Sequence, residues 1–274
     1  GIVITASHNP PLWNGFKYKP NYAGSATPEI TRALEDEINL ARNSVVSSLP
    51  LVSGYDQGLV EDFDPAPSYL DHLHELVDTH SLSSAGLRIQ IDPMYGSASG
   101  YFPTLLNGLS TCVTEIHAEH NPAFPGILQP EPIEKHLGQL SSAVLANRAD
   151  IGIALDGDGD RIGIIDEEGR FISPLQIFAI LALYLLETKG CKGTLVKSNN
   201  STSMIYSLGE LYSVPVLETP VGFKHIAQVM IREDGLIGGE ESGGFGFRGH
   251  IPERDGILSG LYFLDFMVRT GKRA

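Results

Sequence analysis

The stretch that decides the fold is Ile151-Gly-Ile-Ala-Leu-Asp-Gly-Asp-Gly-Asp-Arg-Ile-Gly-Ile-Ile-Asp166. Its two flanks, 151–155 and 162–166, are rich in isoleucine and do not alternate with polar residues, which is typical of strands covered on both faces. Between them, aspartate recurs at every second position with glycine in between. The sequence therefore predicts two buried strands joined by a tight acidic loop.

Outward from this stretch, short apolar runs alternate with helical patterns. The predicted strands are 2–5, 87–91, 113–117, 151–155, 162–166, 194–197, 214–217 and 236–238, the first of them expected to be buried. The predicted helices are 28–42, 67–79, 98–108, 132–146, 174–188, 201–212, 222–232 and 256–270. This alternation predicts an α/β protein of consecutive domains, with mixed, mostly parallel sheets covered by helices.

Two breaks divide the chain into parts. Residues 43–66 are polar and rich in turn residues, without a helical period, and are interpreted as a linker. A second boundary is expected near 168–173. The predicted parts are an incomplete first domain at 1–45, a second domain at 64–170 and a third at 171–274. Because residue 1 already reads as strand, we expect the sequence to be a fragment.

Charge and composition exclude some classes of partner. The 274 residues carry a net charge of −14, which argues against nucleic acid or an anionic membrane as the main partner. The longest apolar run, 177–186, is far shorter than the roughly 20 residues that span a bilayer. The two cysteines, Cys112 and Cys191, have neither disulfide-framework nor zinc spacing, which favours a reducing compartment, the cytoplasm.

The acidic loop is a candidate metal site. Asp156, Asp158 and Asp160 can turn three carboxylates towards one point, and such oxygens suit Mg²⁺ or Ca²⁺. An EF-hand is one alternative, but Arg161 stands where its loop needs glycine, and the flanks read as strands. A purely structural acidic turn is the other alternative. Arg161 beside three acids favours a site that binds metal and phosphate together.

A second motif lies near the start of the chain. Thr5-Ala-Ser-His-Asn-Pro-Pro11 leaves the first predicted strand and is followed by Asn14-Gly-Phe-Lys17. A serine in a loop is usually a turn or capping residue, and His8 alone would more often be a satisfied polar side chain. By themselves, therefore, Ser7 and His8 do not predict a catalytic site.

Taken together, the two motifs resemble the α-D-phosphohexomutase superfamily, which includes phosphoglucomutases, phosphomannomutases and phosphoglucosamine mutases. The resemblance covers nearly the whole chain. Further matching stretches are Gly24-Ser-Ala-Thr-Pro-Glu29, Gln129-Pro-Glu-Pro132, Thr219-Pro-Val-Gly-Phe-Lys224, Gly238-Gly-Glu-Glu-Ser-Gly-Gly244 and His250-Ile-Pro-Glu-Arg-Asp-Gly256.

The resemblance implies roles for individual residues. Ser7 would carry the transferable phosphate, and its phosphate with the three aspartates would hold one Mg²⁺. Arg161 would steady the phosphate. His8 and Lys17 are the general acid/base candidates, Lys17 first, and lysine can serve as a base only if its pKa is lowered. The remaining implied residues, for substrate binding, are Lys224, Glu240, Ser242 and Arg254, with a plain surface ion pair as the alternative for Arg254.

The implied reaction interconverts hexose 1-phosphate and hexose 6-phosphate through a hexose 1,6-bisphosphate. Glucose leads as the substrate because the loop at 238–244 looks more glucose-like than glucosamine-like, with a phosphomannomutase or a dual-specificity mutase as the alternative. A non-catalytic metal- or sugar-phosphate-binding paralogue remains a hypothesis of another class. A phosphatase is disfavoured. It would need an aspartate nucleophile at a strand end, and each aspartate that could serve is better used as a metal ligand. The family fold has four domains, so we expect the isolated 274-residue polypeptide to be a poor mutase.

Overall fold

The computed structural model describes residues 1–45 and 47–274. Two compact units can be distinguished, one made of Gly1–Ser25 with Val77–Ala274 and the other of Ala26–Leu76. The helices of the smaller unit are α1 (Pro28–Ala41), α2 (Leu51–Asp56) and α3 (Ala66–Leu76). The predicted linker at 43–66 includes residue 46, which lies outside the described residues, and the prediction missed α2. That helix starts directly after Pro50, whose fixed φ suits a helix start.

The larger unit contains a five-stranded sheet in the order β4-β3-β5-β6-β7. Its strands are β3 (Arg88–Asp92), β4 (Cys112–Glu115), β5 (Ile151–Leu155), β6 (Ile162–Asp166) and β7 (Phe171–Ile172). The first three strands of that order run parallel, and β6 and β7 are antiparallel to their neighbours. Because the apolar runs of β5 and β6 have no polar face, both strands are wholly buried.

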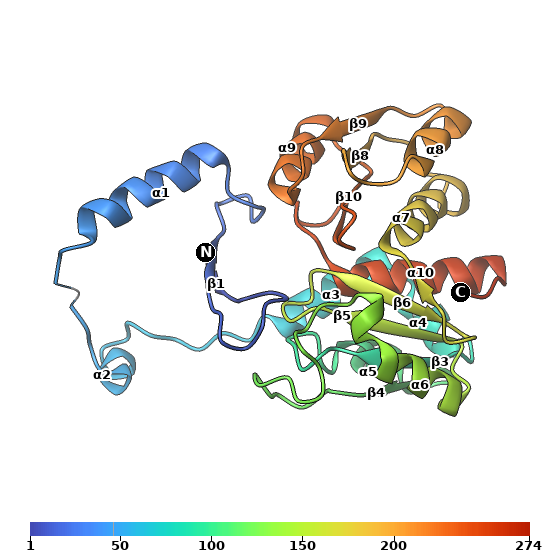
Figure 1. Cartoon of the computed structure of the whole chain (residues 1–274), viewed down its shortest axis with the longest axis horizontal. Helices are drawn as coiled ribbons and strands as arrows, with labels where there is room; N and C mark the ends of the chain where they lie inside the picture. Colours follow the sequence, from blue (N-terminus) through green and yellow to red (C-terminus); the bar gives the residue numbers. More distant parts are fainter. Residues whose placement is uncertain (46) are drawn as a thin grey trace. The chain divides into compact units, whose positions relative to one another are not determined.

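Helices cover both faces of this sheet (Figure 1). The covering helices are α4 (Thr79–Ser84), α5 (Tyr101–Leu106), α6 (Gly138–Asn147) and α10 (Gly256–Thr270), with a short 3₁₀ turn at Glu134–His136 before α6. Gly152 of β5 faces Val144 of α6, and the next residue, Ile153, faces Gly260 of α10. Successive strand residues point to opposite faces, so α6 and α10 lie on opposite sides of the sheet.

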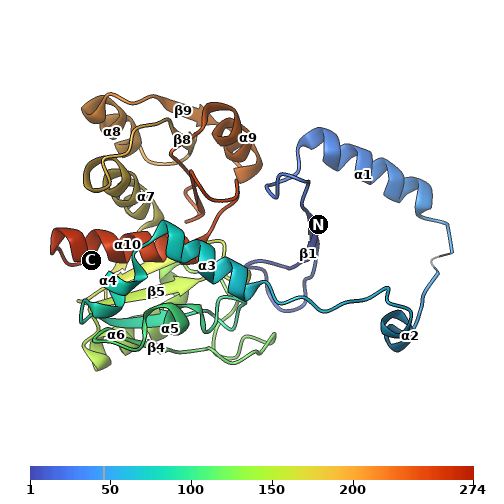
Figure 2. The same ribbon diagram turned by 180° about the vertical axis from the view of Figure 1, so that it is seen from behind.

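A second sheet, in the order β11-β10-β8-β9, follows in the chain (Figure 2). Its elements are α7 (Pro174–Leu183), β8 (Leu195–Ser198), α8 (Met204–Tyr212), β9 (Val216–Thr219), α9 (Phe223–Glu233), β10 (Ile237–Gly239) and β11 (Phe245–Phe247). Only β11 is antiparallel to its neighbour. Helix α9 packs on one face, next to Gly238, and α7 on the other, next to Gly239. A π-helical turn, Tyr184–Thr188, continues α7.

The first strand differs from the prediction. Strand β1 (Ile2–Ile4) pairs with β2 (Phe16–Tyr18) in a two-stranded antiparallel ribbon. Ile2 is 65% exposed and Ile4 is 68% exposed, so the expected burial of this strand is wrong. Among the described residues, β2 is its only strand partner, and a two-stranded ribbon has too little surface to bury both of its faces.

The fold class is confirmed, and a strand overlaps each of the eight predicted strand ranges. The prediction missed β2, β7 and β11, each of two or three residues, and it extended the helix at 67–79 over a break before α4. The three-part domain division stays a prediction. Both cysteines are free thiols. In the described part of the chain, no helix has both the length and the apolar character that crossing a membrane requires.

Candidate active site

The acidic loop connects the antiparallel strands β5 and β6 and is shaped by its first aspartate. Asp156 Oδ1 accepts the backbone N–H groups of Asp160 at 2.9 Å and Arg161 at 3.1 Å, which closes the loop. Gly159 has φ of +74°, the left-handed region that glycine enters without penalty. The three aspartates each offer one carboxylate oxygen within 4.8 Å of the others. The structure therefore brings together the three aspartates among the predicted metal ligands.

Ser7 lies directly against this loop. Its Oγ donates a hydrogen bond to Asp156 Oδ2 at 2.9 Å. Its backbone N–H donates to Thr5 Oγ1 at 2.8 Å, and Thr5 Oγ1 donates to Asp158 Oδ2 at 3.2 Å. Ser7 has φ of +52°, a conformation that costs a non-glycine residue about 1–3 kcal/mol and is found where the surroundings fix it. Thr5, which the sequence analysis did not single out, is one of those fixing contacts.

Gly157 allows the two loops to approach each other. A Cβ at this position would lie 2.4 Å from the carbonyl oxygen of Ser7, closer than any real contact. Gly157 is thus required by space, whereas Gly159 is required by its backbone angle. Any side chain at 157 would push Ser7 away from Asp156.

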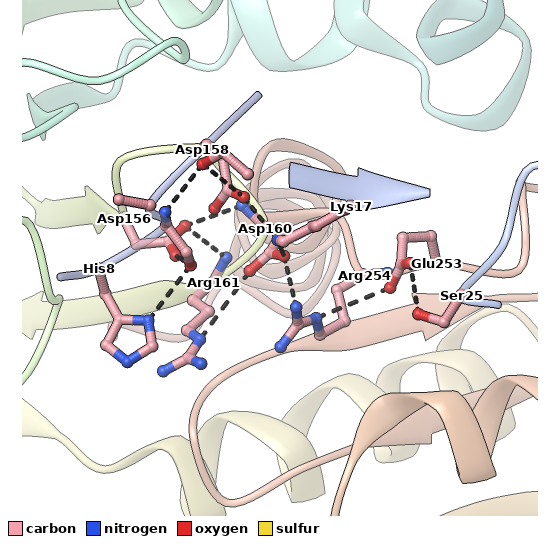
Figure 3. Close-up of polar contacts among 12 residues, drawn as sticks. His8, Lys17, Ser25, Asp156, Asp158, Asp160, Arg161, Glu253 and Arg254 are labelled. Carbon is pink, nitrogen blue, oxygen red and sulfur yellow. Dashed lines mark hydrogen bonds and ion pairs between the residues drawn. The ribbon is translucent and has the colours of Figure 1, made fainter. Parts of the chain in front are cut away.

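Two cations approach the outer carboxylates of the loop (Figure 3). Lys17 Nζ, from β2, lies 2.6 Å from Asp158 Oδ2 and 3.1 Å from Asp160 Oδ2. The guanidinium of Arg254 lies 2.5 Å from the same Asp160 oxygen. The Arg254 side chain is only 13% exposed. The alternative interpretation, in which Arg254 forms a plain ion pair on the surface, is therefore not supported. These cations partly balance a cluster of carboxylates that would otherwise repel one another.

The carboxylates have the properties of metal ligands. Burial, together with the charges of Asp160 and Asp158, raises the pKa of Asp156 well above its usual range. Burial acts in the same direction on Asp158, but Lys17 outweighs it and holds the pKa of that carboxyl below its usual value. The buried Oδ1 atoms of Asp158 and Asp160 accept no hydrogen bond. Two orphaned carboxylate oxygens beside a third acid fit a hard divalent cation.

The acid/base candidates differ in their electrostatics. His8 Nδ1 lies 3.2 Å from Ser7 Oγ. Burial and the charge of Arg161 lower the pKa of His8, which favours a neutral imidazole. Burial also lowers the pKa of Lys17, but Asp160 and Asp158 outweigh it, so the pKa of Lys17 is raised. The lowered pKa that base catalysis by Lys17 requires is therefore absent in this arrangement.

The predicted sugar loop, Gly238–Gly244, reaches the start of β6. The N–H of Ile162 donates to the carbonyl of Gly243 at 3.0 Å. Glu240 is buried and accepts from Arg254 at 3.2 Å, and its burial raises the pKa of the carboxyl. Ser242 is half-buried in the same loop.

Two features lie outside this cluster. Lys224 is exposed in the first turn of α9, and no contact described for it reaches the acidic loop. A cavity of about 440 Å³ borders Ser7 and is lined in part by Trp13, Tyr95 and Phe124. None of the predicted sugar-binding side chains lines it.

The chain matches three consecutive family models, described as domains I, II and III of phosphoglucomutase/phosphomannomutase, over residues 1–44, 67–169 and 173–274. The chain belongs to the phosphoglucomutase/phosphomannomutase family. A phosphoglucomutase/phosphomannomutase of Thermococcus kodakarensis is 31% identical to it over 274 residues, and a phosphoglucosamine mutase of Exiguobacterium sibiricum is 32% identical over 276. Both alignments cover 100% of this chain but only 58% and 59% of the relatives.

Solved structures of phosphoglucomutase/phosphomannomutase relatives share the fold. The crystal structure of a provisionally assigned phosphomannomutase of Thermus thermophilus has a TM-score of 0.90 and 36% identity, covering 99% of this chain and 60% of that one. A phosphoglucomutase of Paramecium, at 20% identity and a TM-score of 0.79, shows the same fold. The chain therefore spans about 60% of the length of the family members it matches.

Proposed function

We propose that the protein carrying this chain is a phosphohexomutase that uses a phosphoserine at Ser7. The observation that supports this most strongly is the 2.9 Å hydrogen bond between Ser7 Oγ and Asp156. Through this bond the Ser7 hydroxyl contacts the three-carboxylate loop, although Ser7 and Asp156 lie 149 residues apart in the sequence. A hydroxyl against a cluster of acids has little use by itself, but a phosphate on that hydroxyl would share a cation with the carboxylates.

The resident ion we propose is one Mg²⁺, held by Asp156, Asp158 and Asp160. When bound, it would neutralise charge on the transferring phosphoryl group. The family membership and the orphaned oxygens of the acidic loop support a divalent cation, and carboxylates combined with a phosphate are ligands typical of Mg²⁺.

The reaction we propose exchanges one phosphorus–oxygen bond for another. The bond between Ser7 Oγ and phosphorus breaks as a hydroxyl of the hexose monophosphate bonds to phosphorus. The proton of that hydroxyl goes to a nearby base, while an acid protonates Ser7 Oγ as its bond to phosphorus breaks. In the second transfer Ser7 Oγ loses its proton as it bonds to the other phosphorus, and the sugar oxygen released takes up a proton. His8, whose lowered pKa keeps it neutral, suits the base, and cationic Lys17 suits the acid. Arg161 would steady the phosphoryl group, and Glu240 with Ser242 would bind sugar hydroxyls in either orientation of the intermediate.

The substrate we propose is a hexose phosphate, with glucose first. The alternative is mannose or both sugars, which the name of the Thermococcus kodakarensis relative favours. Several curated relatives are phosphoglucosamine mutases, so glucosamine belongs in the same test. The cytoplasm stays our prediction for the compartment.

Two measurements on the intact protein test this proposal. Intact mass spectrometry should find one phosphate, which disappears in Ser7→Ala but persists in Ser47→Ala, a change at an exposed serine outside the site. A coupled assay with glucose, mannose and glucosamine 1-phosphates should rank the substrates. A protein that binds sugar phosphates but neither carries phosphate nor turns over any of the three would instead be the non-catalytic paralogue.

A further inference from the structure

Glu253 is a buried carboxylate that the proposed chemistry does not use. It lies in the loop before α10 and is only 8% exposed. Its Oε2 accepts hydrogen bonds from Lys19 Nζ and from Ser25 Oγ, the latter at 2.8 Å. Its Oε1 accepts the backbone N–H of Arg254 at 3.1 Å. One carboxylate thus joins the segment that follows Ser7 to the loop that carries Arg254 (Figure 3).

The charge on Glu253 is stabilised despite its burial. Burial alone would raise the pKa of this carboxyl, but the charge and hydrogen bond of Lys19, the charge of Arg254 and the hydroxyl of Ser25 outweigh it. The pKa of Glu253 is therefore lowered. A buried, ionised carboxylate with partners from two distant segments holds those segments strongly, because removing any partner leaves a buried charge less well satisfied.

Arg254, the neighbour of Glu253, spans the two loops of the candidate active site. It contacts Asp160 of the acidic loop at 2.5 Å and Glu240 of the sugar loop at 3.2 Å. The arginine can lie there because residue 244 is glycine. A Cβ on Gly244 would lie 2.2 Å from Arg254 Cδ, in the middle of the side chain and not at its mobile end.

We propose that Glu253 is a positioning residue that fixes Arg254 across the acidic loop and the sugar loop. Glu253 holds Arg254 in this way while its carboxylate also accepts hydrogen bonds from Lys19 and Ser25, which belong to the segment that carries Ser7. A fixed arginine keeps its planar donors aligned, whereas a free one loses rotamer freedom at each binding event. The docking of the phosphoserine segment and the geometry of the sugar loop are thereby linked through one carboxylate. This inference rests on the proposed mutase function.

The test begins with Glu253→Gln in the intact protein, which preserves shape and removes the charge. We expect kcat/KM for the hexose phosphate to fall about tenfold, the loss typical of a charged hydrogen bond. We also expect faster hydrogen exchange at the amides of residues 19–25. The matched control is Glu210→Gln, an exposed glutamate on α8, which should change neither quantity.

A double-mutant cycle separates positioning from general destabilisation. If Glu253 acts through Arg254, Glu253→Gln should cost less than about twofold in kcat/KM once Arg254 is alanine. Gly244→Ala should also lower kcat/KM in the wild type and lose that effect in the Arg254→Ala background. An equal cost of Glu253→Gln in both backgrounds would overturn the inference, as would unchanged exchange at residues 19–25.

The two proposals fail in different ways. An intact protein without mutase activity contradicts the proposed function, while hydrogen exchange still reports whether Glu253 holds the segment. If the protein is an active mutase, and Glu253→Gln changes neither kcat/KM nor hydrogen exchange at residues 19–25, only the positioning role is contradicted.

Discussion

Gly157→Ala should separate the phosphoserine loop from the acidic loop. The new Cβ would lie 2.4 Å from the carbonyl oxygen of Ser7, and carbon and oxygen in contact lie roughly 3.3 Å apart. The difference, 3.3 − 2.4, means that the two loops must part by about 0.9 Å. A displacement of that size typically costs about 100-fold in the rate of a positioned reaction. Overpacking should also lower the free energy of unfolding by about 1–3 kcal/mol.

The measurement is kcat in a coupled assay of glucose 1-phosphate turnover, with circular dichroism to show that the variant is folded. Gly138→Ala is the matched control, because a Cβ at that first position of α6 meets nothing within 4 Å. It should leave kcat unchanged. A folded Gly157→Ala protein with kcat within about twofold of the wild type would refute the argument that this glycine sets the distance between Ser7 and Asp156.

Three further results are expected. Asp158→Asn removes one of three ligand charges, so the Mg²⁺ concentration for half-maximal activity should rise at least about tenfold in a metal titration. His117 is hydrogen-bonded to Asp92, which raises the pKa of the imidazole; its contribution to stability is therefore complete below about pH 6.5 and lost as pH rises through the folded-state pKa. The Tm difference between wild type and His117→Asn should accordingly be larger at pH 6 than at pH 9, and an equal difference would contradict this. Tyr184→Phe removes the hydroxyl that donates to buried Asp265 and should cost about 1–3 kcal/mol in urea unfolding without changing KM.

The sequence predicted the candidate site best where the functional residues lie close together in the chain. Asp156, Asp158 and Asp160 lie within five residues, and their spacing with glycine predicted a loop that gathers carboxylates. The structure does gather them. Ser7 could be connected to them only through resemblance, because nothing in periodicity indicates a contact across 149 residues.

Partners that come from distant segments could not be predicted. Arg254 lies 94 residues from Asp160, and Lys19 lies 234 residues from Glu253. Each contact depends on how two sheets and a ribbon pack, which hydrophobic pattern does not specify. Lys17 is paired with two carboxylates of the acidic loop, and the sequence did not predict that pairing.

The shortest strands failed for a different reason. Strand β11, Phe245-Gly-Phe247, is three residues long and has glycine at its centre. Pattern recognition needs at least four residues of apolar or alternating character. Such strands form because a neighbouring strand offers its free edge, as β10 does here.

Helix α10 has a consequence for how this protein could be divided. Every residue from Gly256 to Met267 is buried, and the helix packs against β5 and β6, although it follows the second sheet in the chain. Its first N–H donates to the carbonyl of Gly159, inside the acidic loop. Excising residues 77–170 would therefore uncover part of one face of the first sheet and remove the hydrogen bond that α10 donates to the acidic loop. Exchanging residues 77–170 between relatives should give a folded protein only when helix α10 is exchanged together with them.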